Sequence, residues 1–162
     1  MTEKEMYLNV NEREFKTTVR VLQALPADKL DFKPHERSRT AGHLAWGFTS
    51  EDQIIAMALD GNIDFSKLHQ NQPATLAEVI AGYEASHAQT VARVQAASEE
   101  DLNKMISFAG QTIRVIDVFW FIQMDAIHHR GQFSVYLRLA GGKVPSIYGP
   151  SADEPWDAPV EA

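Results

Sequence analysis

The sequence contains no cysteine among its 162 residues. This absence excludes disulfide bonds, thiolate metal ligands and a cysteine nucleophile. It leaves the redox compartment open, and a cytoplasmic location is the default expectation.

Long apolar runs are also missing. No stretch approaches the roughly 18 consecutive apolar residues that a membrane-spanning helix needs, so no such helix is expected. The first ten residues, MTEKEMYLNV, carry alternating charges, and they lack the apolar run of a signal peptide. We therefore expect no membrane association.

Basic residues are scarce. The chain has 15 lysines and arginines against 22 aspartates and glutamates, which gives a formal net charge of −7. An acidic surface repels phosphate backbones, so non-specific nucleic-acid binding lacks its main electrostatic driving force. We expect no nucleic-acid partner.

Apolar residues are abundant, at 44% of the chain, and their spacing is helical almost throughout. This length predicts one domain over residues 1–162 with a continuous core. Thr75 followed by Glu78 matches a capping box, and Ser38 is the expected N-cap of the second helix. The pattern predicts four helices, over about 5–25, 39–60, 75–97 and 113–140. Residues 62–73 read as a long connection, 99–112 as a turn with a short extended crossing, and 144–162 as an extended tail.

The fourth predicted helix directs ionisable groups toward the core. On a helical wheel Asp125 and His129 lie one turn apart on the apolar side. Arg130 and Gln123 fall on the opposite, polar side, which predicts a surface ion pair or an intersubunit contact for Arg130. The sequence MDAIHHRGQF (124–133) thus combines core packing with titratable side chains.

The second and third predicted helices repeat this arrangement. On the third predicted helix His87 lies in the middle of the apolar stripe. On the second, Glu51 lies within the apolar stripe and His43 at its flank. Gly47, a poor helix former, is expected to leave room for a ligand. Burial of charge is costly unless the group is paired, hydrogen-bonded or bound to a metal. Because bundle interiors are common metal and cofactor sites, the pattern predicts a polar pocket among these helices.

Two segments resemble the DinB family, in the broader DinB/YfiT-like group. They are HHRGQFSVYLRLAGGKVPSIYGPSADE (128–154) and SRTAGHLAWGFTSE (38–51). The resemblance implies an all-α, up-down-down-up four-helix bundle with an extended C-terminal tail, often dimeric. It also implies a metal site of three histidines, and relatives that are thiol-dependent S-transferases.

Carried over by position, the resemblance matches His129 directly. The histidine usual four residues earlier is Asp125 here, and a carboxylate is also a metal ligand. The family's metal-binding histidine on the second helix aligns with Gly47, which has no side chain to bind a metal. His43 or Glu51 would have to supply that ligand instead. We predict a zinc or nickel site formed by His43, Asp125 and His129. The side chains expected around it are Glu51, His87, His128 and Gln132.

Two functional hypotheses follow. One is a metal-dependent enzyme, an S-transferase or hydrolase, acting on a small molecule and using a low-molecular-weight thiol in the S-transferase case. The other is a metal-free relative that binds a ligand or partner without catalysis, in which Asp125 and His129 form a hydrogen-bonded pair. Both versions are expected to be homodimers that associate through helix faces bearing Trp46 or Trp120.

Overall fold

The computed structural model describes residues 1–156 and confirms the all-α four-helix bundle. Its long helices are α1 (Glu3–Gln23), α2 (Ala41–Asp60), α3 (Leu76–Ala96) and α5 (Val115–Leu139). Short 3-10 turns lie at Ala27–Lys29 (η1) and Phe65–Lys67 (η2). The segment expected to hold a turn and a short extended crossing forms a short helix, α4 (Glu99–Asn103), and an antiparallel hairpin of β1 (Met105–Phe108) and β2 (Gln111–Arg114). Within residues 1–156, no helix is both long and apolar enough to cross a bilayer.

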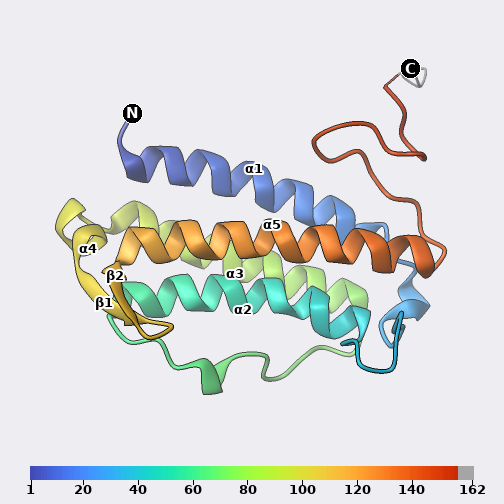
Figure 1. The fold of residues 1–162 in the computed structure, drawn as a ribbon, viewed down its shortest axis with the longest axis horizontal. Helices are drawn as coiled ribbons and strands as arrows, with labels where there is room; N and C mark the ends of the chain where they lie inside the picture. The colour runs from blue at the N-terminus through green and yellow to red at the C-terminus, as the bar shows by residue number, and fades with distance from the viewer. Residues whose placement is uncertain (157–162) are drawn as a thin grey trace.

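The four long helices follow an up-down-down-up order. In Figure 1, α1 and α5 run in one direction and α2 and α3 in the other. Each of α1 and α2 packs against both α3 and α5. Because α2 and α3 are parallel neighbours, residues 61–75 must return along the length of the bundle, and Figure 1 shows this connection running beside α2.

Capping residues set the helix ends close to the predicted positions. Thr75 and Glu78 form the expected capping box at the start of α3. The predicted N-cap at Ser38 is wrong. Thr40 fills that role, since its side-chain oxygen accepts a hydrogen bond from the backbone N–H of His43 at 3.0 Å. Gly61 ends α2 in the left-handed conformation, with φ of 79°, which glycine adopts without steric cost.

The core consists of two apolar clusters separated by a polar layer. One cluster lies toward the hairpin end and includes Tyr7, Ile116 and Phe119. The other lies toward the opposite end and includes Phe48 and Phe133. The buried polar side chains between them come from all four long helices: Glu14 and Thr18 from α1, Thr49, Ser50, Glu51 and Asp52 from α2, His87 and Thr90 from α3, and Gln123 and Arg130 from α5.

The helical-wheel assignment of α5 is wrong at two positions. Arg130 and Gln123, both expected on the polar side, are only 1% and 4% exposed. The cause is that α5 is covered on two sides, by α1 and by α2, so it has no single inward face. Gln123 and Arg130 face α1, where they bond Asn11 and Glu14 respectively.

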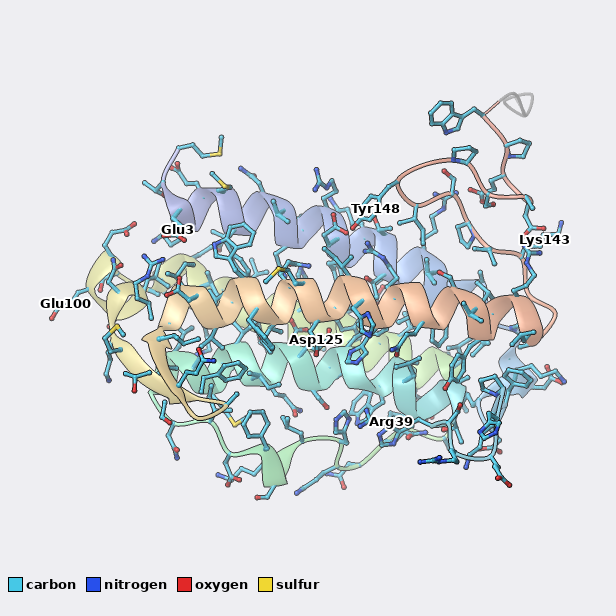
Figure 2. The ribbon with its side chains drawn as sticks, viewed as in Figure 1. Glu3, Arg39, Glu100, Asp125, Lys143 and Tyr148 are labelled. Carbon is cyan, nitrogen blue, oxygen red and sulfur yellow. The ribbon has the colours of Figure 1, made fainter. Side chains whose placement is uncertain are left out.

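The C-terminal segment packs along the body as an extended chain. Ile147 joins the second apolar cluster, and the Tyr148 hydroxyl bonds to Arg130 and Glu14 in the space between α1 and the tail (Figure 2). Trp156 does not pack, because it is 77% exposed. Residues 157–162 of the predicted tail lie outside the described residues.

Candidate metal site

Three potential metal ligands converge between α2 and α5. Glu51 comes from the middle of α2, and Asp125 and His129 lie one turn apart on α5, with Asp125 between the two ribbons in Figure 2. One ligand atom of each residue lies within 4.8 Å of the other two. His129 Nδ1 is 2.8 Å from Glu51 Oε1 and 3.7 Å from Asp125 Oδ2. Two helices thus supply the three donors.

Burial and hydrogen bonding shift the pKa values of Glu51 and His129. Glu51 is 7% exposed, and burial raises the pKa of its carboxyl group to about 7 even though the bond from His129 opposes that shift. The hydrogen bond to Glu51 in turn raises the pKa of His129. A buried carboxylate with a single imidazole partner is incompletely compensated, so a bound cation would stabilise its charged form.

Glu51, Asp125 and His129 line a common pocket. Its volume is about 70 Å³, and Gly47, Ser50 and His69 form part of its wall together with the ligand residues. The space is several times the roughly 10–15 Å³ that a single water requires, so it has room for a metal ion together with a bound water or part of a substrate. Gly47 does line the pocket as expected. A Cβ there would meet only the His69 ring, at 3.8 Å, so the glycine keeps room in the pocket without being sterically required.

His43 and Glu51 were the alternatives for the second-helix ligand, and the structure places Glu51 beside Asp125 and His129. The His43 ring instead stacks on His69, with centroids 4.9 Å apart. His69, which belongs to the 61–75 connection, is a pocket residue that the sequence analysis did not include. Its backbone N–H donates to Ser50 Oγ at 3.1 Å, and its Nδ1 lies 3.2 Å from the same oxygen. No helical periodicity could have revealed this contact, since it depends on how the 61–75 connection returns along α2.

The remaining predicted pocket residues lie elsewhere. His128 and Gln132 are exposed, and they bond each other at 2.7 Å on the outer face of α5. His87 is buried against the ring of Phe15, and its Nε2 lies 3.2 Å from a carboxylate oxygen of Glu12. The structure therefore places His87 and Gln132 away from Asp125 and His129, and the His128 ring lies beside the His129 ring, with centroids 5.7 Å apart.

A second charged cluster lies on the α1 side of α5 and was not expected. Arg130 Nη2 bonds Glu14 Oε2 at 2.6 Å, and both side chains are almost fully buried. Arg130 also donates to the backbone oxygen of Glu14 and to the Tyr148 hydroxyl, over whose ring it lies. Both Nη atoms of the guanidinium bond to protein groups, so this cluster ties α1, α5 and the tail together.

The donor set at Glu51, Asp125 and His129 fits a divalent metal. Zinc accepts imidazole nitrogen and carboxylate oxygen, and three protein ligands leave a position for water or substrate. The pocket above the ligands provides room for that fourth position.

Comparisons with known proteins agree with this architecture. The sequence model described as "DinB family" matches residues 1–158. The curated protein YrdA of Bacillus subtilis (strain 168) is 30% identical over 151 residues, which cover 91% of this chain and 89% of YrdA.

Two solved structures share the fold. A DinB-like protein of Bacillus cereus ATCC 10987 superposes with a TM-score of 0.79 at 23% identity, covering 89% of this chain and 97% of that one. YfiT of Bacillus subtilis gives a TM-score of 0.64 at 14% identity, with 86% of this chain and 89% of YfiT covered. YfiT is described as a probable metal-dependent hydrolase with an unusual four-helix bundle topology.

Proposed function

Since this chain belongs to the DinB family, we propose that it is a metal-dependent enzyme acting on a small molecule in the pocket between α2 and α5. The observation that carries the proposal is the convergence of Glu51, Asp125 and His129 on one point. The relation to YfiT adds support through the shared fold. In this proposal Glu51 takes the place of His43 as the ligand from α2.

The proposed metal is zinc, because one imidazole and two carboxylates form a ligand set that zinc accepts; nickel is the alternative. When bound, the ion would polarise a substrate oxygen or activate a water or thiol. The carboxylates of Glu51 and Asp125 would neutralise the positive charge of the ion. They also lie beside His129 and orient its ring. The proposed reaction is hydrolysis, with transfer to a low-molecular-weight thiol as the alternative.

Elemental analysis of protein purified without an affinity tag, from cells supplied with zinc, nickel and manganese, tests the proposal. We expect about one equivalent of a divalent metal in the natural protein and a drop of at least about tenfold in His129→Ala. His128→Ala is the matched control, because that neighbouring ring is exposed and bonds only Gln132 among residues 1–156. Less than about a tenth of an equivalent in the natural protein would favour the metal-free alternative.

The proposal includes a homodimer, with the interface on the outer face of α5. The two tryptophans first expected at the interface, on α2 and α5, make hydrogen bonds inside the chain: Trp46 Nε1 donates to the Gln70 carbonyl and Trp120 Nε1 to Glu3. Exposed apolar side chains instead follow α5, and a run of them on one helix is typical of an association surface. They are Phe121, Met124, Val135 and Leu139.

Sedimentation tests this association. We expect a dimer for the natural protein and a shift toward monomer for Met124→Lys, because a buried unpaired charge opposes association. Met105→Lys, a change at an equally exposed methionine on the hairpin, should leave the dimer intact. A natural protein that stays monomeric at high concentration would contradict the prediction.

A further inference from the structure

Groups of both charge signs line the pocket beside the candidate ligands. Glu51 and Asp125 are its acidic residues, and Arg39 and His69 also belong to its lining. Arg39 directly precedes the N-cap of α2, and His69 belongs to the connection that runs beside α2. Figure 2 shows Arg39 close to that connection and Asp125 further inside, between the ribbons.

The Arg39 side chain has no carboxylate partner among residues 1–156. Its main chain is nonetheless held in place, since the Tyr136 hydroxyl donates to the Arg39 carbonyl oxygen at 3.1 Å. A guanidinium on an anchored backbone at a pocket mouth can grip a carboxylate or phosphate through two parallel hydrogen bonds.

His69 is held beside it in an unusual conformation. Its φ is 57°, in the left-handed region that non-glycine residues seldom occupy. Such backbone persists where the surroundings impose it, often at a binding site. Here both the backbone N–H and the ring Nδ1 of His69 contact the buried hydroxyl of Ser50.

The contact with Ser50 also favours one form of the ring. Ser50 Oγ accepts from the His69 backbone N–H, so its own proton is available for His69 Nδ1. A neutral ring that accepts at Nδ1 carries its proton on Nε2 and is a donor there. Burial lowers the pKa of His69, in keeping with a neutral ring.

The balance of charges in the pocket also favours an anionic ligand. A divalent ion neutralises the carboxylates of Glu51 and Asp125, which leaves the positive charge of Arg39 without a partner in the pocket. The chain as a whole has a net charge of −7, which repels anions in bulk. A lone cation at the mouth supplies the local attraction that an anionic substrate needs.

From these observations we propose that the substrate carries a carboxylate or phosphate group and that Arg39 and His69 bind this group at the pocket mouth. This inference rests on the proposed metal-dependent function and specifies its substrate class. The side chains of Arg39 and His69 line the same pocket as the candidate ligands. An anionic group bound by them would leave the reacting bond close to Glu51, Asp125 and His129.

Cobalt(II)-loaded protein provides a test that needs no knowledge of the reaction. Cobalt substitutes for zinc, and its visible absorption reports changes around the ion. Acetate, inorganic phosphate and neutral acetamide are titrated separately, with cobalt content measured on every sample. We expect a spectral shift with an anion and none with acetamide, and the tighter of the two anions identifies the group recognised.

Two variants separate recognition at the rim from simple ligation of the metal by the anion. We expect Arg39→Gln to weaken anion binding at least about tenfold with unchanged cobalt content, through loss of two charge-assisted hydrogen bonds. Arg37→Gln, an identical change at an exposed site two residues away, should alter the affinity less than about twofold. Ser50→Ala should also weaken binding, because His69 loses its support.

The outcomes are distinguishable. Equal anion affinity in Arg39→Gln and the natural protein, or no response to either anion with cobalt bound, would overturn the inference and leave the metal site in place. Failure of the natural protein to bind cobalt would overturn the proposed function, and the inference would fall with it.

Discussion

Replacement of Arg130 by alanine is expected to destabilise the protein by about 3 kcal/mol, because the buried Glu14 carboxylate keeps only the exposed Arg13 as a counter-ion. Arg130 is 1% exposed and Glu14 is 3% exposed, and their side chains meet at 2.6 Å. The variant also loses the bonds from Arg130 to the Glu14 carbonyl oxygen and to Thr18. Urea unfolding, with the midpoint and slope fitted separately, measures the change in free energy.

Two control variants separate the loss of a buried ion pair from the loss of an arginine side chain in general. Arg138→Ala makes the same change on the same helix but breaks an exposed pair with Asp153, which should cost at most about 1 kcal/mol. The double variant Glu14→Leu with Arg130→Met removes both charges together and should recover most of the loss. An Arg130→Ala variant no less stable than Arg138→Ala would show that the buried pair contributes little.

Glu51→Gln is expected to have opposite effects on metal binding and on the stability of the metal-free protein. Loss of a ligand should weaken zinc binding by more than about 100-fold, beyond the effect of removing a neighbouring hydrogen-bond partner. The neutral amide also avoids the cost of burying a carboxylate. With burial raising the pKa of Glu51 from 4.5 to about 7 and each pKa unit equal to about 1.4 kcal/mol, the metal-free variant should gain on the order of 3 kcal/mol at pH 8.

The pH dependence follows from the sign of these shifts. A carboxyl group whose pKa is higher in the folded state destabilises the fold as pH rises from its ordinary 4.5 through about 7. The raised pKa of His129 acts in the same direction, because its stabilising contribution is lost as pH rises through its folded pKa. We therefore expect the stability of the metal-free natural protein to fall between about pH 5 and pH 8.

Glu51→Gln should flatten this profile, and Glu84→Gln, a change at an exposed glutamate, should leave it unchanged. Chemical unfolding at several pH values in the presence of a chelator measures both variants. Identical slopes in the natural protein and in Glu51→Gln would show that the buried carboxyl group does not control the pH dependence.

The four long helices could be predicted from the sequence because each repeats apolar residues at helical spacing over more than five turns. The DinB resemblance, which was drawn from segments on α2, α5 and the tail, is confirmed by the family model that matches residues 1–158. The proximity of Asp125 to His129 also followed from local geometry, since residues four apart share one helix face.

What the sequence could not supply was the relation between elements. The wheel of α5 assumed one buried side, whereas α1 and α2 cover two sides, and this reversed the assignment of Arg130. The choice between His43 and Glu51 depended on the rotation of α2 about its own axis. The role of His69 required knowledge of the path of a loop, which leaves no periodic trace in the sequence.

The returning 61–75 connection has a consequence for how this fold diversifies. It closes the pocket from outside, while the candidate ligands belong to helices fixed by the core. Loops tolerate insertions and deletions that packed helices do not. Changes in the 61–75 connection can therefore alter which substrates the pocket accepts, while the candidate metal-binding residues on α2 and α5 stay the same.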